Sequence, residues 1–176
     1  MMNLQYKNLL PSLFSPESRV WIYQSSRLFT VSEAFFIEDK LNEFAAQWTS
    51  HGDPVKGSGH LFFGRFIILL ADESATGVSG CSTDGSVRLI KSLESELHAP
   101  FFDRQLLALI VKDKIELMPL VQLRYAAEHR FIGPDTLYFN NAVQTKKELE
   151  ENWIIPLRQS WLAKKIQFGD LPISRN

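Results

Sequence analysis

The chain has 176 residues, which is long enough for one domain with a substantial hydrophobic core. Hydrophobic residues make up 45% of it and charged residues 22%, a composition that excludes a disordered chain. The formal net charge is -1, so no overall positive charge is available to bind a polyphosphate backbone. We therefore expect a single domain over residues 1–176 and no nucleic-acid partner. The alternatives are two small domains, and a local basic face that binds nucleic acid, for which Lys164 and Lys165 are candidates.

Cysteine content and hydropathy indicate the cellular compartment and whether the chain binds a membrane. Cys81 is the only cysteine, which rules out an internal disulfide and favours a reducing compartment, so we expect a cytoplasmic protein. The first 14 residues lack the basic start and the apolar run of a signal peptide. The most apolar segment, Leu61–Ala71, is too short to span a bilayer, so we expect no membrane partner.

The N-terminal half predicts four segments. Residues 19–29 begin with β-branched and aromatic residues typical of a strand. Thr30 or Ser32 can then cap a helix over residues 31–48, in which apolar residues recur at steps of three and four. The glycines and the proline of residues 50–59 predict a loop, and residues 61–71 are β-like in composition and predict a central strand.

The next elements are a helix, a hairpin and a short strand. The helix begins near Ser82 or Asp84 and runs to Leu97. Residues 106–118 predict a hairpin with a charged turn, interrupted at Pro119. Residues 120–132 fit a strand or a helix, of which we favour the helix, and residues 136–139 predict a short strand.

The C-terminal segment predicts a long amphipathic helix. Thr145 and Glu148 have the spacing of a capping box, and large apolar residues follow at every fourth position: Leu149, Trp153, Leu157 and Trp161. Pro156 should bend this helix or divide it. Its apolar stripe packs within the domain or forms a homo-oligomer interface. The order of elements predicts an α+β fold, with a mainly antiparallel sheet packed by helices.

Several short motifs together resemble one family: Val20-Trp21-Ile22-Tyr23, His51-Gly52, Ser79-Gly80-Cys81-Ser82-Thr83-Asp84, Ser86-Val87-Arg88 and Phe139-Asn140-Asn141. The family comprises small bacterial proteins, mostly from Bacteroidota, that are uncharacterised and often labelled as ABC transporter ATPases. The resemblance covers nearly the whole chain and implies no established active site.

The ATPase label can be tested on the residues, because a P-loop requires G-x-x-x-x-G-K-[ST]. Gly59 and Gly64 have the spacing of its two glycines. Arg65 and Phe66, however, stand where the lysine and the hydroxyl residue must be. We therefore expect no P-loop and no nucleotide cofactor.

Residues 79–88 form the most plausible ligand site. Small and hydroxyl residues precede a helix there, so free backbone amides can bind a small anion, with Ser82, Thr83, Ser86 and Arg88 as ligand residues. The alternative is that Asp84 caps the helix in the ordinary way. Cys81 at the helix start could be a reactive thiolate, and its alternative role is a small buried side chain.

Arg65 and His51 complete the candidate residues. Arg65 interrupts an apolar segment, so it pairs with Asp72, Glu73 or a ligand anion, or it lies at a bulge or a solvent-facing edge. His51 lies in a glycine-rich loop and could act in catalysis, although a surface turn also explains it. None of the four histidines has helical ligand spacing, so we expect no metal site. The alternative is a composite site of His51 and Asp53 with Asp72 and Glu73.

Because strong core signals coexist with no complete chemical motif, we expect a non-catalytic cytosolic protein-association module. The alternative is a small enzyme, or a protein that binds an anion or phosphate ligand around residues 79–88. In that case Arg65 and Arg88 bind the anion, and Cys81 or His51 performs the chemistry. Whether the chain is an enzyme stays open at this point.

Overall fold

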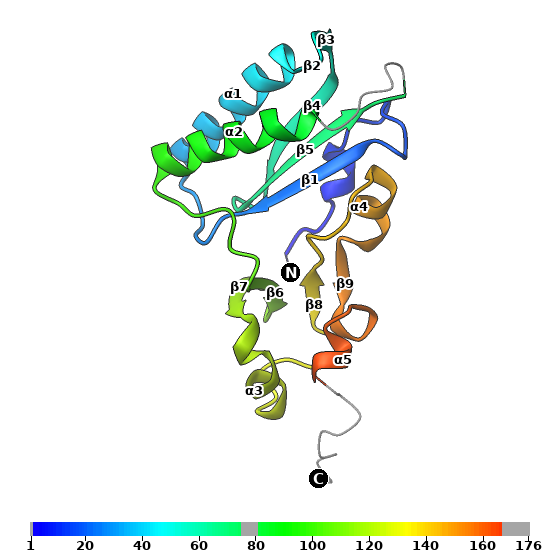
Figure 1. The fold of residues 1–176 in the computed structure, drawn as a ribbon. Coiled ribbons are helices and arrows are strands. Elements are labelled where there is room, and N and C mark those ends of the chain that lie inside the picture. Colours follow the sequence, from blue (N-terminus) through cyan, green and yellow to red (C-terminus); the bar gives the residue numbers. More distant parts are fainter. Residues whose placement is uncertain (1, 75–80, 167–176) are drawn as a thin grey trace. The chain divides into compact units, whose positions relative to one another are not determined.

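A computed structural model of the chain describes residues 2–74 and 81–166, except for the side chains of residues 81–83. It confirms a mixed α+β fold with antiparallel sheets (Figure 1). The chain forms two compact units. The larger unit comprises residues 5–103 and 141–151, and the smaller unit comprises residues 1–4, 104–140 and 152–176. That both units belong to one domain remains a prediction.

The larger unit is built on a three-stranded antiparallel sheet with the order β1-β5-β4, made of β1 (Arg19–Gln24), β5 (Phe66–Asp72) and β4 (Lys56–Phe62). Every residue of the central strand β5 is buried. Because side chains alternate along a strand, Ile67, Leu69 and Ala71 face one side of the sheet, and the residues between them face the other. Both faces of this sheet are therefore covered.

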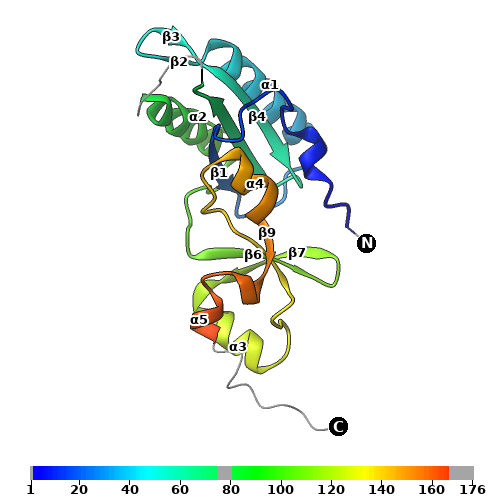
Figure 2. The same cartoon turned by 90° about the vertical axis from the view of Figure 1, so that its right-hand side faces the viewer.

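Two helices lie side by side on one face of this sheet, α1 (Val31–Gln47) and α2 (Cys81–Leu97) (Figures 1 and 2). The expected helices over residues 31–48 and up to Leu97 are thus confirmed. The other face is covered by η1 (Tyr6–Leu9) and α4 (Lys146–Asn152). Tyr6 links these two elements to the sheet, because its ring packs edge-on against Phe62 and its hydroxyl donates to the carbonyl of Leu149.

The start of α1 is fixed by a network of caps. Thr30 and Glu33 form a capping box, so each side chain satisfies a backbone amide of the other residue. Arg27 binds both carboxylate oxygens of Glu33, at 2.9 and 2.6 Å, and also donates to the carbonyl of Leu97 at the end of α2. The bonds from Arg27, followed by that from the Thr30 amide, lower the pKa of Glu33 to about 2. This network ties the two helices together.

The segment between α1 and β5 differs from the predicted loop and single strand. Short strands β2 (Thr49–Ser50) and β3 (Asp53–Pro54) pair with each other, and β4 already begins at Lys56. The apolar run over residues 61–71 is divided by a turn at residues 63–65, so the prediction of one strand was wrong. Phe63 and Gly64 both have positive φ, at +53° and +59°, which reverses the chain.

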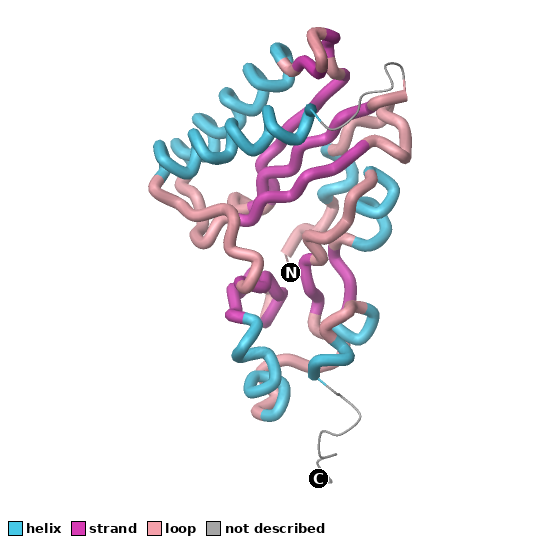
Figure 3. The backbone as a smooth tube through the Cα atoms, viewed as in Figure 1, coloured by secondary structure: helices cyan, strands magenta, loops and turns pink. Residues whose placement is uncertain are grey.

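The smaller unit has a four-stranded antiparallel sheet with the order β7-β6-β8-β9 (Figure 3). Its strands are β6 (Leu106–Val111), β7 (Lys114–Pro119), β8 (Leu137–Phe139) and β9 (Ile154–Pro156). The helical elements are η2 (Leu120–Gln122), α3 (Leu123–Glu128), η3 (Leu157–Gln159) and α5 (Ala163–Ile166). The predicted hairpin, its end at Pro119, the helix within residues 120–132 and the short strand are confirmed.

The long C-terminal helix is not found in the described residues. A helix does start after Thr145, whose hydroxyl accepts from the Glu148 amide, while the Glu148 carboxylate accepts from the Gln144 amide. This helix, α4, ends at Asn152, and β9, η3 and α5 follow it. Trp153 is fully buried and packs edge-on against Phe139, with ring centroids 5.3 Å apart. Leu149, Trp153 and Leu157 of the four-residue repeat are therefore core residues in different parts of the chain, whereas Trp161 is 48% exposed, so the repeat does not form one helical stripe.

Candidate functional site

The predicted ligand segment lies at the start of α2, which begins at Cys81. Residues 79 and 80, and the side chains of Cys81, Ser82 and Thr83, are outside the described residues. From Asp84 onward the placement is defined. Asp84 is exposed in the first turn of the helix, where its charge suits the helix dipole.

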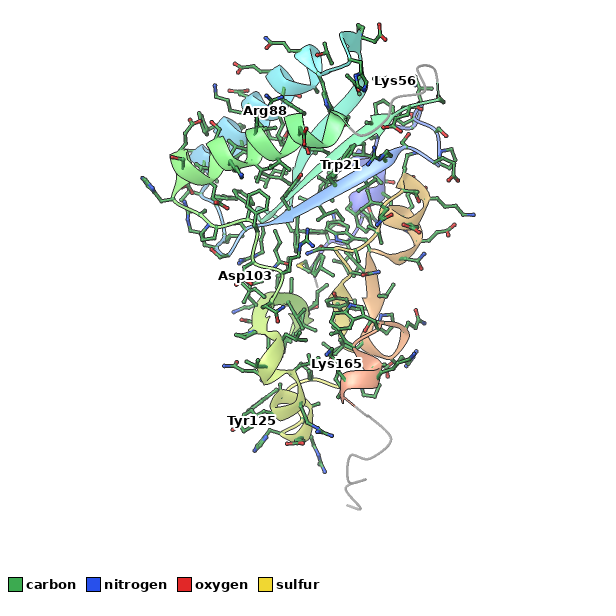
Figure 4. The ribbon with its side chains drawn as sticks, in the orientation of Figure 1. Trp21, Lys56, Arg88, Asp103, Tyr125 and Lys165 are labelled. Atoms are coloured by element: carbon green, nitrogen blue, oxygen red, sulfur yellow. The ribbon has the colours of Figure 1, made fainter. Side chains whose placement is uncertain are left out.

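Ser86 and Arg88 have separate surroundings on α2. The Ser86 side chain is fully buried, and its Oγ lies 3.0 Å from the hydroxyl of Tyr23 on β1. Burial raises the pKa of Tyr23 above its ordinary value, so this phenol stays protonated at neutral pH. Ser86 thus forms part of the core, whereas Arg88 is exposed on α2 (Figure 4).

His51 lies at the same end of the larger unit as the start of α2. It is exposed in the β2–β3 turn with a φ of +53°, a left-handed backbone that such a turn requires. The strand β2 beside it contacts α2. The structure therefore brings His51 and the first turns of α2 to one end of the sheet, as the ligand-site hypothesis requires.

Arg65 lies at the opposite end of β5. It belongs to the β4–β5 turn and donates to the carbonyl of Ser25 at 3.3 Å. The seven residues of β5 separate it from the His51 end by roughly 20 Å, at the usual rise of a strand. Arg65 therefore does not join the other candidate residues around one small anion.

Asp72 and Glu73, the carboxylates predicted to pair with Arg65, bind other residues. Asp72 accepts from the Ser74 amide at 3.1 Å, from Lys56 at 3.0 Å and from the Ser15 amide at 3.1 Å. Its bonds with Ser74, and then that with Lys56, hold the pKa of Asp72 well below its usual range. Glu73 pairs with Arg19 at 3.4 Å. These contacts fix the end of β5 and serve the fold.

Two buried polar atoms near the start of α2 lack a hydrogen-bond partner among the described residues. They are Trp48 Nε1 and Ser50 Oγ, which belong to buried side chains. The Trp48 indole lies against Gly85 of α2, since a Cβ built on Gly85 would be 3.8 Å from Nε1. A buried donor without a partner is costly, so it indicates a bound water or a polar ligand.

Three exposed apolar side chains of the larger unit lie at or next to the start of α1. Leu28, Val31 and Phe35 are exposed by 60%, 73% and 68%. We call these three residues the α1 patch. The helical pattern contained a signal for it, because Val31 and Phe35 lie off the face that carries Ile37 and Leu41. Sequence reasoning missed it by considering only the buried face.

In residues 2–74 and 81–166, no group of three or more His, Cys, Asp or Glu side chains is placed to hold a metal ion. No helix of the described chain is long and apolar enough to cross a membrane.

Comparisons with known proteins give no family. No protein-family model matches the chain, and no match is found among curated proteins or among solved structures. Function is therefore inferred from the residues and their geometry.

Proposed function

We propose that the chain is a non-catalytic, cytosolic protein-association module that forms a homodimer through the α1 patch. The observation that supports this proposal is the exposure of Leu28, Val31 and Phe35 on a helix end that is itself rigidly held. Contiguous apolar side chains at a protein surface usually mark an interaction site. The single cysteine supports a reducing compartment.

The α1 patch is suited to contact between two copies. Val31 and Phe35 are one helical turn apart, and the capping network of Thr30, Glu33 and Arg27 holds that turn in place. A surface already ordered before binding loses little conformational entropy on association. Three side chains cover less than the ~800 Å² per partner of a standard interface, so we expect weak, reversible dimers.

Sedimentation velocity over a range of protein concentrations tests this proposal. We expect the weight-average sedimentation coefficient to rise with concentration in the parent chain, in the range of tens to hundreds of micromolar. The double substitution Val31→Ser with Phe35→Ser should abolish that rise, because it removes the apolar surface that the dimer buries. Its melting temperature should stay within a few degrees, since both side chains are exposed.

A matched control carries the same chemical change in the smaller unit. Val121 and Phe131 are exposed by 87% and 63%, and their double replacement by serine should leave the concentration dependence unchanged. A parent chain that stays monomeric over the whole range would contradict the proposal. So would association that the α1 variant retains in full.

A second candidate function is supported by the orphan donor of Trp48. In this alternative, a small anion binds at the end of the larger unit where the His51 turn and α2 meet. The Trp48 Nε1–H group and the first amides of α2 supply donors, and Arg88 supplies positive charge. Cys81, the first residue of this helix, would then be a thiolate stabilised by the helix dipole.

The reactivity of Cys81 separates the two candidate functions. With a small thiol reagent, the anion-site candidate predicts rapid reaction near neutral pH in the native protein and slower reaction when phosphate is added. Reaction that requires unfolding, with no effect of phosphate, would make Cys81 a structural residue and exclude this candidate. Lys40→Ala, which changes an exposed charge on α1, provides a control for nonspecific effects of charge.

A further inference from the structure

The near-neutral charge of the chain conceals a separation of charge between its two units. The larger unit has 10 Lys and Arg residues and 15 Asp and Glu residues, whereas the smaller unit has nine and five. The net charges are therefore -5 and +4. The net charge of the whole chain, -1, does not favour binding of nucleic acid, but the net charge of the smaller unit alone, +4, does.

The smaller unit also carries a row of exposed aromatic rings along α3 and the turn that follows it. Tyr125 and His129 stack with centroids 3.9 Å apart and planes inclined by 29°. Phe131 continues the row, at 6.3 Å from His129 and 14° from parallel. Tyr125 and Phe131 are exposed by 58% and 63%. We call these three residues the α3 row.

The buried side of α3 and a hydrogen bond of His129 hold the α3 row in place. Leu123, Ala126 and Ala127 of the same helix are buried against the sheet of the smaller unit. His129 Nδ1 lies 2.9 Å from the carbonyl of Tyr125, so this nitrogen carries the hydrogen and donates it. The imidazole is thereby fixed above the Tyr125 ring. The rings form a preordered surface, and little entropy is lost when a ligand stacks on it.

Positive charge alternates with these rings along the chain. Arg124 precedes Tyr125, and Arg130 lies between His129 and Phe131; both arginines are exposed. On α5, which packs against α3, Lys165 lies over the ring of Trp161 at 5.7 Å. Glu128 is the one carboxylate within α3, and it pairs with Arg124 at 3.6 Å. The helix surface therefore combines stacking faces with cations.

We infer that the α3 row binds single-stranded nucleic acid. Proteins that bind single strands combine aromatic rings, on which bases stack, with cations that follow the phosphates. Tyr125 and His129 cover one face of each other, so bases would stack on the ring surface that stays exposed, and Tyr125 and Phe131 are each more than half exposed. The inference is independent of the proposed dimer, which uses the α1 patch of the larger unit.

Fluorescence anisotropy of 5′-labelled U20 and dT20 with the whole chain tests this inference. At 50 mM salt we expect saturable binding that weakens steeply as the salt concentration rises, because phosphate contacts release counterions. Tyr125→Ala and Phe131→Ala should each weaken binding about tenfold, the usual effect of removing one stacked ring. Arg130→Ala should weaken binding and lower the salt slope by about one.

The control is Phe35→Ala, which removes an equally exposed ring from the larger unit and should leave the affinity unchanged. Absence of binding at 50 mM salt would overturn the inference. Equal affinity for duplex, or equal competition by poly-L-glutamate, would also overturn it, since both indicate attraction of any polyanion. Loss of dimerisation in the Phe35 variant, with nucleic-acid binding intact, would show that the two proposals succeed or fail separately.

Discussion

Replacing Trp153 with alanine is expected to lower the free energy of unfolding by about 4 kcal/mol, because the largest fully buried side chain of the smaller unit is removed. Its indole packs edge-on against Phe139 of β8, and its carbonyl accepts from the Asn140 amide. The substitution would leave a cavity in a sheet whose strands β8 and β9 have three residues each. Urea unfolding followed by far-UV circular dichroism measures the loss.

The matched control is Trp161→Ala in the same unit. Trp161 is 48% exposed, so its removal should cost clearly less, about 1 to 2 kcal/mol. A long C-terminal helix would have placed both indoles on one stripe, and the two substitutions would then have similar effects. Similar losses in the two variants, or a change in oligomeric state with stability unchanged in W153A, would contradict the structure described for residues 146–166.

The sequence predicts the fold best where one local signal has no competitor. The helix α1 has both an apolar period and a capping box, and its bounds differ from the prediction by one residue at its end. The β6–β7 hairpin was recognisable from two apolar runs around a charged turn. In these cases the local preference and the tertiary structure agree.

Two segments were wrongly predicted for identifiable reasons. Residues 61–71 are apolar except for Gly64 and Arg65, which were included in one strand, yet the chain reverses there because Phe63 and Gly64 have a left-handed backbone. Residues 149–161 repeat apolar side chains every four residues, but Pro156 lacks an amide hydrogen and ends β9 instead of bending a helix. For residues 149–161, spacing alone could not distinguish a helical face from apolar positions on separate elements.

The candidate site was predictable only in part, because it depends on which ends of the elements meet. His51 and the start of α2 do meet, whereas Arg65 lies at the other end of β5. The α1 patch and the α3 row are exposed. Hydrophobic periodicity identifies the buried face of a helix, so it did not predict either surface. Charge was likewise evaluated for the whole chain, although its two units have opposite net charge.

Replacing Gly57 with alanine is expected to lower the free energy of unfolding by about 3 kcal/mol, the upper range for overpacking a core. A Cβ at this position on β4 would lie 2.4 Å from Trp48 Cε3 and 3.0 Å from Cζ3. The Trp48 ring cannot easily withdraw, because it is buried and packs against Trp21 and Phe44, with centroids 5.6 and 4.7 Å away. Either β4 or the indole must therefore shift.

A double-mutant cycle assigns this loss to the contact with Trp48. In the background Trp48→Leu, which removes the ring, Gly57→Ala should cost about 1 kcal/mol or less, because the clash is absent. Gly133→Ala is the control for the general effect of the substitution, since a Cβ there would meet nothing within 4 Å. Equal costs of Gly57→Ala in the two backgrounds would show that the close approach of β4 to Trp48 does not limit this position. Such a result would mean that the larger unit tolerates a Cβ at position 57 despite the short distance to the Trp48 ring.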